Sequence, residues 1–528
     1  MARVRGGKGA DGAEKAATYR GSLSLLATLV MCFTFLCVVL LERPAVGAAL
    51  RTLAAAPGNL SQTSITTLAQ LLVVPLVCAL VAYVVAAQAV SLLRIALYRN
   101  HLHRYAEHWL RTYAPLRAAG IRLTGTRHDP DGTAQAATKL PLDSASVATL
   151  SLLLLGGAGA GKTTALHILA FELTRRRKLI PLYLRRAPLP ILLSAATFDG
   201  EAVFGAKGFL RLLQRQVGTF GTKGLAARLP RMVRRGRIVV LCDGLDELPA
   251  LDRKQIGDAL AGLLMGYTKH TTAIVSCDLR IYEEELRTLA PLKALERVVI
   301  NEIATDEACE ALRRRTSSGG SRRLTASDTR GALESHRLME SIRTPAGLAA
   351  LMALNQGGET WPYGRGELLR SYARALCGGG AGERPDADRK ALLLGALAVS
   401  LRVAGTRTLK IPRARSMGRV MVEWLDETPP LAPTELKLES HLIASPEEAE
   451  SACQDALARG ILLRTPDGAG IAFANSVLEA TFAAWWLDLL DDGMGRLNAE
   501  LLQGGWTLPV MLWLGAQRNP ADLAARLY

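Results

Sequence analysis

The 528-residue chain lacks the cysteine and histidine patterns that hold zinc. Its eight cysteines form no C-x-x-C pair, and its eight histidines form no H-E-x-x-H motif. Those spacings carry the zinc sites of small metal-bound domains and of metalloproteases. Unpaired cysteines also suit a reducing compartment. We therefore expect a reduced cytosolic domain without structural zinc, and we exclude a membrane-anchored zinc protease.

Aromatic residues are also scarce, at 5% of the chain, although the formal net charge is +16. Proteins that bind nucleic acid usually combine basic clusters with a recognisable motif or with aromatic side chains that stack on bases. No such motif accompanies the basic clusters at 175–178 and 313–315. We predict no specific nucleic-acid partner, which leaves anionic lipid or a solvated face as uses of the charge.

Charge is absent from two long apolar tracts near the N-terminus. Residues 21–41 contain no charged side chain and are long enough to cross a bilayer as a helix. A second uncharged tract covers 52–93, and because Pro57 and Gly58 break its start we place the second span at 68–93. A cleaved signal peptide is the alternative for the first span, since small residues at 45–48 offer a cleavage site.

Positive residues flank these two spans unevenly. Five Lys or Arg residues precede the first span and three closely follow the second, whereas the connecting loop carries two arginines and one glutamate. The positive-inside rule therefore places both ends of the chain in the cytoplasm. We predict a multi-pass cell-membrane protein with the lipid bilayer as a partner. The sequence leaves open whether the spans are a passive anchor or a membrane-permeabilising effector.

Residues 156–163 read G-G-A-G-A-G-K-T, which fits the phosphate-binding pattern G-x-x-x-x-G-K-[ST] without a gap. An apolar strand-like run precedes this loop and a helix-like run follows it. Glycines permit the positive φ at which backbone N–H groups converge on one anion, and the helix N-terminus adds its dipole. Lys162 is expected to reach the β and γ phosphates, and the Thr163 hydroxyl to bind Mg²⁺. The predicted nucleotide-binding residues of this segment are Gly156, Gly157, Ala158, Gly159, Ala160, Gly161, Lys162, Thr163 and Thr164.

The second motif is I-V-V-L-C-D-G-L-D-E at 238–247. A buried apolar strand ending in Asp243 places a carboxylate beside the phosphate loop, where we expect it to hold Mg²⁺ through water. Asp246 and Glu247 are the catalytic candidates, because either can polarise the attacking water. The alternative for both acids is capping of the next helix, where negative charge is favoured.

Gly236-Arg237, an apolar run, Cys242 and D-G-L-D-E together resemble the NACHT family of STAND-class P-loop NTPases, which includes NOD-like receptors and their bacterial relatives. The resemblance covers about residues 145–490, with a second core strand at 181–184 and a sensor strand at 273–277. It implies that Pro345 packs on the nucleotide base and that Asn475, near the end of a winged helix, lies by the β-phosphate. It further implies ATP and Mg²⁺ as cofactors, ADP/ATP exchange, and homo-oligomers on activation.

Three positions depart from the family pattern. Asp278 replaces the arginine that usually ends the sensor strand, and an acid there repels the γ-phosphate unless Mg²⁺ or Arg280 compensates. Asn475 replaces a histidine, so it can donate a hydrogen bond but carries no charge. Glu479-Ala480-Thr481 replaces Gln-Glu-Tyr. Nucleotide binding is therefore predicted more firmly than hydrolysis, and a slow ATPase is the expectation if hydrolysis is retained.

The predicted fold is an α/β P-loop NTPase core with a parallel sheet, followed by helical and winged-helix domains and preceded by two transmembrane helices. Core strands are expected at 151–155, 180–185, 237–242, 272–276 and 297–301, winged-helix helices at 386–404, 414–426 and 447–459, and a hairpin around 466–468. The predicted segments are a basic N-terminus (1–20), membrane helices (21–41 and 68–93) around an extracytoplasmic loop (42–67), a linker (94–145), the NTPase core (146–302), a helical domain with hinge (303–384), a winged-helix-like domain (385–490) and a short C-terminal helical segment (491–528).

The favoured function is a membrane-anchored signalling or innate-defence switch that binds Mg-ATP and oligomerises. An ATPase motor for transport or membrane remodelling is one alternative, although the chain has no L-S-G-G-Q motif of ABC transporters. A nucleotide-binding scaffold with weak hydrolysis is the other, suggested by Asp278. The stimulus, the choice of ATP over GTP and the completeness of the C-terminus stay open.

Overall fold

The computed structural model divides into two compact units, Met1–Ile95 and Ala96–Tyr528, which we describe separately. The first predicted span at 21–41 and the strand predicted at 180–185 lie outside the described residues. The described residues are 62–111, 113–128, 134–142, 150–175, 187–194, 205–248, 250–267, 271–287, 295–317, 326–355, 361–378, 384–412, 415–427, 445–465, 468–487 and 506–517.

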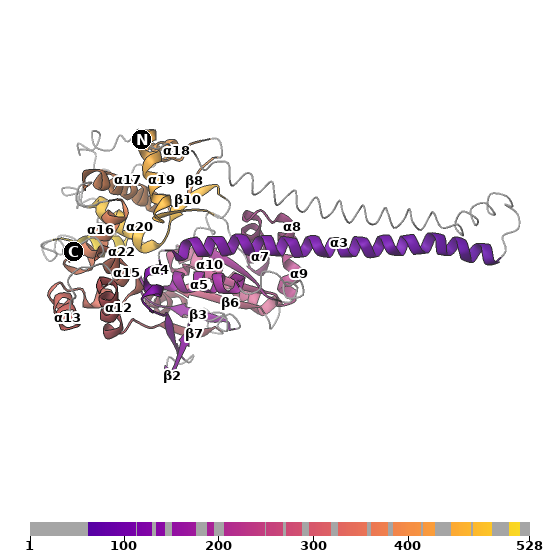
Figure 1. Cartoon of the computed structure of the whole chain (residues 1–528), viewed down its shortest axis with the longest axis horizontal. Coiled ribbons are helices and arrows are strands. Elements are labelled where there is room, and N and C mark those ends of the chain that lie inside the picture. Colours follow the sequence, from indigo (N-terminus) through magenta and orange to yellow (C-terminus); the bar gives the residue numbers. More distant parts are fainter. Residues whose placement is uncertain are drawn as a thin grey trace. The chain divides into compact units, whose positions relative to one another are not determined.

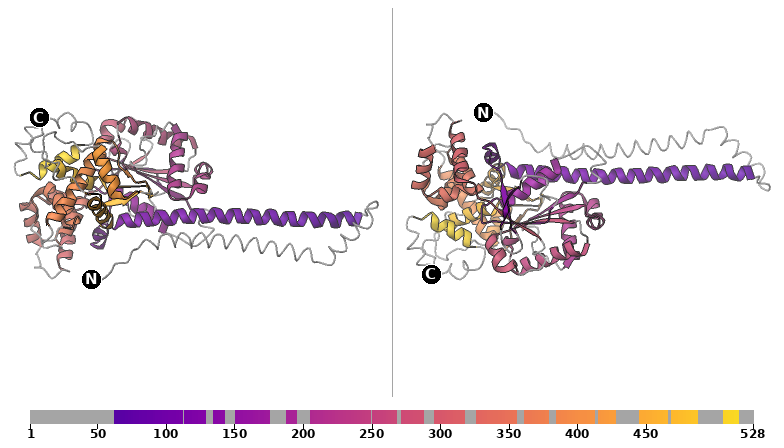
Figure 2. Two further views of the ribbon diagram at one scale, coloured as in Figure 1. Left: turned by 90° about the horizontal axis from the view of Figure 1, so that it is seen from above. Right: turned by 90° about the horizontal axis from the view of Figure 1, so that it is seen from below.

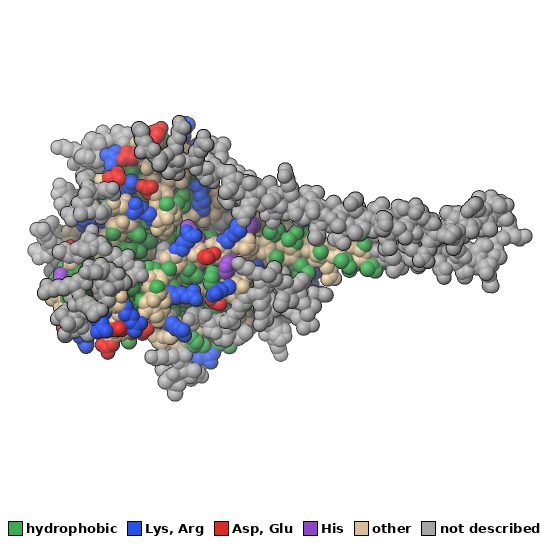
Figure 3. All heavy atoms as spheres, viewed as in Figure 1, with side chains coloured by type: hydrophobic (Ala, Val, Ile, Leu, Met, Phe, Trp, Pro, Cys, Tyr) green, Lys and Arg blue, Asp and Glu red, His purple; other side chains and the backbone are tan. Residues whose placement is uncertain are grey.

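Helix α3 runs without interruption from Gln62 to Leu110. Large apolar side chains stand exposed on it, among them Leu80 at 61% and Tyr83 at 72%, and Figure 3 shows hydrophobic side chains along this helix. An 18-residue window within Leu80–Leu110 has a mean hydropathy of 2.0 and is only 6% buried. By length and composition, this one helix of the described part of the chain could cross a membrane. Its low burial differs from that of a core helix in a soluble protein, which is mostly buried. Residues 62–67, predicted as loop, are helical.

The centre of the second unit is a seven-stranded sheet in the order β2-β1-β7-β3-β6-β5-β4 (Figure 1). Strands β3 to β7 run parallel, because each pairs with its neighbour in parallel register. The predictions at 151–155, 237–242, 272–276 and 297–301 are confirmed as β3, β5, β6 and β7. The strands are β1 (Thr124–His128), β2 (Ala134–Pro141), β3 (Leu152–Leu155), β4 (Leu189–Ser194), β5 (Ile238–Asp243), β6 (Thr272–Cys277) and β7 (Glu296–Ile300).

Three strands differ from the prediction. Residues 94–145, predicted as a linker, instead contribute β1 and β2, which pair antiparallel with each other and extend the sheet beyond β7. Strand β4, which pairs with β5, lies in a segment to which we assigned no element. Its second residue is Pro190, which usually argues against a strand because proline has no N–H to donate. The position is tolerated because β4 is at the edge of the sheet.

Helices surround this sheet (Figures 1 and 2). Helix α5 packs on β4, β5 and β6, and α7 packs on β4 and α10. The strands they cover are buried along almost their whole length, as expected for a parallel sheet. The helices of this region are α4 (Ala114–Ala118), α5 (Lys162–Arg175), α7 (Gly205–Thr219), α8 (Lys223–Ala226), α9 (Leu229–Arg234), α10 (Ala250–Tyr267) and α11 (Leu279–Ile281), with a 3-10 turn η3 (Leu245–Glu247) and a π-helical turn η4 (Tyr282–Leu286).

A mainly helical region follows the sheet and ends in a small three-stranded sheet in the order β8-β10-β9. Strands β9 and β10 form the predicted antiparallel hairpin, and three predicted helices are confirmed as α17, α18 and α19. The elements are α12 (Thr305–Ser317), α13 (Ala326–Ser335), α14 (Met339–Ile342), α15 (Pro345–Leu354), α16 (Gly364–Leu376), α17 (Arg384–Val403), β8 (Leu409–Lys410), α18 (Met417–Glu427), α19 (Pro446–Ala458), β9 (Leu462–Arg464), β10 (Gly470–Phe473), α20 (Ser476–Leu487) and α22 (Thr507–Gly515).

Helices α17 and α20 form the tightest pair of this region. Gly395 of α17 permits the close approach, because a Cβ at this position would lie 2.9 Å from the Phe482 carbonyl oxygen. Trp486 of α20 is completely buried beside it. The order helix, helix, hairpin is that of a winged helix, and its last helix, α20, begins directly after the residue predicted to read the β-phosphate.

Candidate functional site

The predicted phosphate loop connects the carboxyl end of β3 to the first residue of α5, Lys162. Two of its glycines have positive φ, Gly159 at 81° and Gly161 at 97°, so the conformation expected of a phosphate loop is present. Strand β3 lies between β6 and β7, while the next parallel strand along the chain, β4, is at the sheet's edge. The loop therefore occupies the point where the strand order reverses, which is where open α/β sheets bind their ligands.

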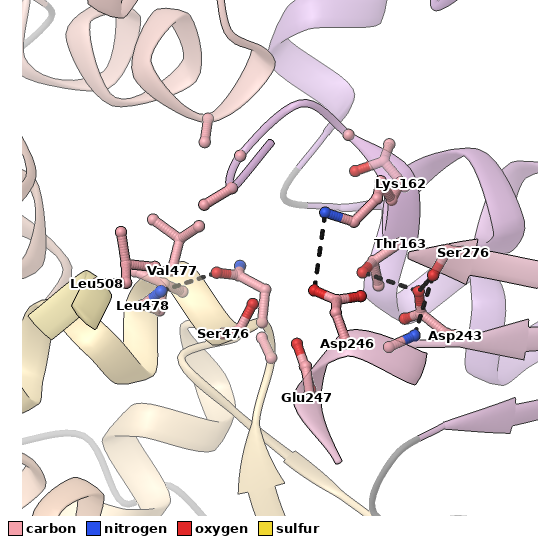
Figure 4. A pocket seen from close by; sticks show the side chains of 18 of the residues that line it. Lys162, Thr163, Asp243, Asp246, Glu247, Ser276, Ser476, Val477, Leu478 and Leu508 are labelled. Carbon is pink, nitrogen blue, oxygen red and sulfur yellow. Dashed lines mark hydrogen bonds and ion pairs between the residues drawn. The ribbon is translucent and has the colours of Figure 1, made fainter. Parts of the chain in front are cut away.

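Lys162 folds back over its own loop. Its Nζ donates to the carbonyl oxygens of Gly156 at 2.8 Å and Gly157 at 3.2 Å. The same ammonium lies 4.0 Å from Asp246 Oδ2 (Figure 4). It also lies 3.9 Å from Asp278 Oδ2. Its side chain is only 12% exposed. A partly buried positive charge is thus held where a phosphate would replace the two carbonyl contacts.

The side chain of Asp278 is paired with Lys162 and not with the guanidinium of Arg280. Asp278 Oδ1 accepts a hydrogen bond from the Arg280 backbone N–H, whereas the Arg280 guanidinium pairs with Glu284 at 2.8 Å on the surface. Of the two compensating charges we considered, Arg280 is therefore directed elsewhere in this conformation. The positive charge beside Asp278, the acid that replaces the family's arginine after the sensor strand, is therefore that of Lys162.

Asp243 ends β5 at the centre of a hydrogen-bonded cluster. Its Oδ1 accepts from the hydroxyls of Thr163 at 3.2 Å and Ser276 at 2.7 Å, and Ser276 in turn accepts from the Gly244 N–H (Figure 4). Burial and the neighbouring Glu247 raise the pKa of Asp243 to about 6, against the opposing effect of the two hydroxyls and Lys162. A Mg²⁺ ion fits this set, because it favours oxygen ligands and would offset the cost of burying the carboxylate.

This raised pKa predicts how metal-dependent binding varies with pH. Above about pH 6 Asp243 is ionised and free to hold Mg²⁺, whereas below it a proton competes with the metal. Mg²⁺-dependent nucleotide affinity should therefore fall roughly tenfold per pH unit below pH 6. The measurement is the nucleotide dissociation constant from pH 5 to 8, with Mg²⁺ and with a chelator. Asp243→Asn should remove the difference between the two curves, and an unchanged difference would contradict the assignment.

The two catalytic candidates point to different neighbours. Gly244, at φ 76°, turns the chain after β5 and precedes η3, so neither acid is the capping residue of that turn. Asp246 lies beside Lys162, whereas the Glu247 carboxylate lies close to Ser476 of α20 and interacts with Arg407. Burial is the main cause of a raised pKa for both acids. In this conformation Asp246 is the candidate nearer the phosphate loop.

A cavity of about 1160 Å³ opens beside the phosphate loop. Pro345, at the start of α15, and Asn475, just before α20, both line it together with Lys162 and Asp243. Asn475 also caps α20, because its Oδ1 accepts the Leu478 N–H at 2.8 Å, which leaves its amide nitrogen to donate to a ligand. The other predicted residues on the wall are Gly157, Ala158, Gly159, Gly161, Thr163, Thr164, Asp246 and Glu247.

Gly156 and Ala160 are the two predicted residues outside that wall, among the residues the structure describes. They face each other, since a Cβ on Gly156 would lie 3.0 Å from Ala160 Cβ. Their part in the loop is to let its two ends approach. Val477, Leu478 and Leu508 lie across the cavity from Lys162, so an apolar wall faces the charged one (Figure 4).

Three further residues contact the site and were not predicted. Ser276 is the next-to-last residue of the mostly apolar strand β6, where a hydroxyl gives no signal until Asp243 is known to lie beside it. Arg365 of α16 donates to the Ala158 carbonyl oxygen at 3.1 Å. Arg407, in the segment between α17 and β8, approaches the Glu247 backbone oxygen at 3.5 Å. The last two come from distant sequence, so only the fold reveals them.

A buried cluster of charged side chains connects the turn η3, which Arg407 contacts at Glu247, to helices α17 and α20. Glu479 of α20 is paired with Arg402 of α17, at 3.0 Å between Nε and Oε1, and with Arg407. The Glu479 and Arg402 side chains are 6% and 8% exposed. Three charges removed from water in this way stabilise one another only while all are present.

No protein-family model matches the chain, and no curated protein matches it. Solved structures similar to it include Cdc6p from Pyrobaculum aerophilum, which is 14% identical, with 65% of this chain and 88% of that chain covered and a TM-score of 0.25. The ORC1 protein of Aeropyrum pernix in complex with DNA is 14% identical, with 75% and 93% covered and a TM-score of 0.29. The ADP form of A. pernix ORC2 is 13% identical, with 65% and 90% covered and a TM-score of 0.26.

Such low TM-scores carry no argument, so the fold assignment rests on the chain itself. A glycine-rich loop with positive φ joins a central parallel strand to a helix, and an acid at the end of a second parallel strand bonds the threonine that follows the loop lysine. These features make the second unit an α/β P-loop NTPase fold.

Proposed function

We propose that the protein is a membrane-anchored, NACHT-like nucleotide switch that binds Mg-ATP between its P-loop core and its C-terminal helices. The observation that carries this is the cavity beside the phosphate loop, whose wall comes from both regions. Lys162 and the phosphate loop supply the core side, and Pro345 and Asn475 supply the other. A ligand that contacts both can favour one arrangement of the two over another, which is the requirement for a switch.

Different residues around the cavity are expected to bind the phosphates, the Mg²⁺ ion and the base of Mg-ATP. Lys162 and the loop N–H groups would hold the phosphates, while Thr163 and Asp243 would hold Mg²⁺. Pro345 and the apolar wall opposite Lys162 suit an uncharged base. Bound Mg²⁺ would neutralise phosphate charge, and Asp246 would orient the attacking water. ADP is expected in the resting state and ATP in the active one.

Helix α3 supports the membrane part of the proposal. Its exposed apolar stretch and the flanking positive residues favour insertion with the P-loop core in the cytoplasm, where nucleotide is available. Signalling or defence through nucleotide-driven homo-oligomers is the expected output, by resemblance to the NACHT family.

One specific observation favours a second candidate, a nucleotide-binding scaffold with weak hydrolysis. Glu247 is engaged by Ser476 and Arg407, and Asp278 lies beside Lys162 at the γ-phosphate end of the loop. A carboxylate held in this way does not activate water. Steady-state phosphate release separates the two candidates, since a switch must complete repeated slow cycles, whereas a scaffold should show little or no turnover.

The test of the switch is assembly that depends on nucleotide. Full-length protein in vesicles containing anionic lipid is incubated with Mg²⁺ and either ADP or ATP, and the oligomers are sized by crosslinking. ATP should yield larger assemblies than ADP, and the same size distribution with both would reject the switch. Release of a trapped dye in the ATP sample would identify the spans as an effector, and its absence as an anchor.

A further inference from the structure

The last turns of α3 pack along α5, the helix that begins at the phosphate loop. The His103 ring stacks on Phe171 with centroids 4.4 Å apart, and the Trp109 ring stacks on His167 at 4.2 Å with 14° between the planes. His103 Nδ1 also lies 3.1 Å from the buried hydroxyl of Thr174. These two stacked pairs, six residues apart on α3 and four residues apart on α5, hold this end of α3 against α5.

His167 connects that contact to the metal-binding threonine. It follows Thr163 by one helical turn, and its Nδ1 lies 2.9 Å from the Thr163 carbonyl oxygen. A carbonyl only accepts hydrogen bonds, so Nδ1 carries the proton. Burial lowers the pKa of His167 to about 4, so the ring is neutral near pH 7. The position of this ring therefore bears directly on the residue whose hydroxyl bonds Asp243.

The other edge of Trp109 reaches the winged-helix region. Its Nε1 donates to the Ala474 carbonyl oxygen at 2.8 Å, and Ala474 immediately precedes Asn475 and Ser476. Ser476 in turn lies close to the Glu247 carboxylate. The indole is 6% exposed, so both contacts are buried. One side chain at the end of α3 thus touches the two protein segments that face the nucleotide cavity from opposite sides.

We propose that Trp109 is a positioning residue that couples helix α3 to the nucleotide state of the cavity. This rests on the proposed function and adds the route by which the apolar helix is affected. If segment 474–476 withdraws from Glu247, the Ala474 carbonyl moves away from Trp109. If ligand rearranges Thr163, His167 moves beneath the indole. Either change alters how the end of α3 packs on α5 and on segment 474–476. By linkage, a change in that packing alters the nucleotide affinity.

A role in packing alone would need neither polar contact. Trp109 belongs to an apolar cluster with Leu463, Ala474 and Leu478, and a phenylalanine would supply most of that burial. The indole N–H adds a donor aimed at one backbone oxygen, which a phenylalanine lacks. Trp109→Phe therefore retains the stack on His167 and removes the link to Ala474.

The experiment uses the full-length protein in detergent micelles, labelled with 5-fluorotryptophan. The chain has seven tryptophans, and Trp109→Phe identifies the fluorine resonance of Trp109 by its loss. We expect that resonance to shift between Mg-ADP and a Mg-bound, non-hydrolysable ATP analogue. We also expect Trp109→Phe to release ADP about tenfold faster, equivalent to about 1.4 kcal/mol, because the Ala474 carbonyl loses its donor.

Trp513→Phe is the matched control, since Trp513 is equally buried, on α22. It should release ADP within about twofold of wild type, as expected for a core change at a residue that does not line the cavity. The inference is overturned if the Trp109 resonance is identical in both nucleotide states, or if Trp109→Phe releases ADP as Trp513→Phe does. Trp109→Tyr is the second variant should the phenylalanine form not fold. If wild-type protein binds neither nucleotide, the proposed function fails instead.

Discussion

Lys162→Ala is expected to weaken Mg-ATP binding by roughly 100-fold or more. Lysine at this position supplies charge-assisted hydrogen bonds to phosphate, and each such bond contributes about 1.5–3 kcal/mol. The side chain is already held over the loop, so little ordering is needed when phosphate replaces the carbonyls of Gly156 and Gly157. The measurement is isothermal titration of nucleotide-free protein with a non-hydrolysable ATP analogue and Mg²⁺.

Two variants make this result specific. Lys254→Ala removes an exposed lysine of α10 and should bind as wild type does. Asp246→Asn should still bind nucleotide and should lose phosphate release, because Asp246 is the catalytic candidate that lies beside Lys162 and the phosphate loop. Binding by Lys162→Ala at the wild-type affinity would remove the phosphate-loop assignment altogether. Equal, undetectable turnover in all of them would leave only the scaffold.

Glu479→Gln should lower the free energy of unfolding by about 3–5 kcal/mol. The change leaves the guanidinium of Arg402, itself 8% exposed, and that of Arg407 without their shared carboxylate. Glu247 still interacts with both arginines, but buried positive charge that is only partly compensated is costly because water does not reach it. Denaturant unfolding followed by circular dichroism gives the change, provided that the transition is cooperative.

The control for this substitution is Glu423→Gln on the surface of α18. Glu423 pairs with Arg419 at 3.1 Å one turn away and with Arg415, and its side chain is 37% exposed against 6% for Glu479. Exposed pairs contribute about 1 kcal/mol or less, so this variant should be nearly as stable as wild type. Equal effects of the two substitutions would mean that the cluster around Glu479 is hydrated, contrary to its burial here.

The parts of the fold that were predictable are those with short-range signals. Buried strands β3, β5, β6 and β7 are continuous apolar runs, and the phosphate loop follows one of them directly. Glycine at positions 159 and 161 is required by positive φ, which a motif records faithfully. The hairpin β9–β10 was likewise visible, because a turn sequence separates two apolar segments.

What escaped prediction depends on partners far away in the chain. Strand β4 contains Pro190 and becomes a strand only because the sheet offers it an edge. Strands β1 and β2 are polar and gain their place by pairing with each other and with β7. Arg407 and Trp109 line the cavity from outside its motifs, and Arg365 contacts the phosphate loop. No local sequence pattern predicts these long-range contacts, because they depend on the tertiary packing.

The carboxylates around Lys162 have a consequence for the order in which ligands arrive. Asp243, Asp246, Glu247 and Asp278 share the cavity wall with a single lysine of the phosphate loop. Arginines line other parts of the cavity, but beside Lys162 the phosphates of free ATP would meet these carboxylates, whereas ATP already complexed to a divalent cation arrives largely neutralised. ATP should therefore bind as its metal complex, and the protein should respond to the concentration of that complex rather than to total ATP.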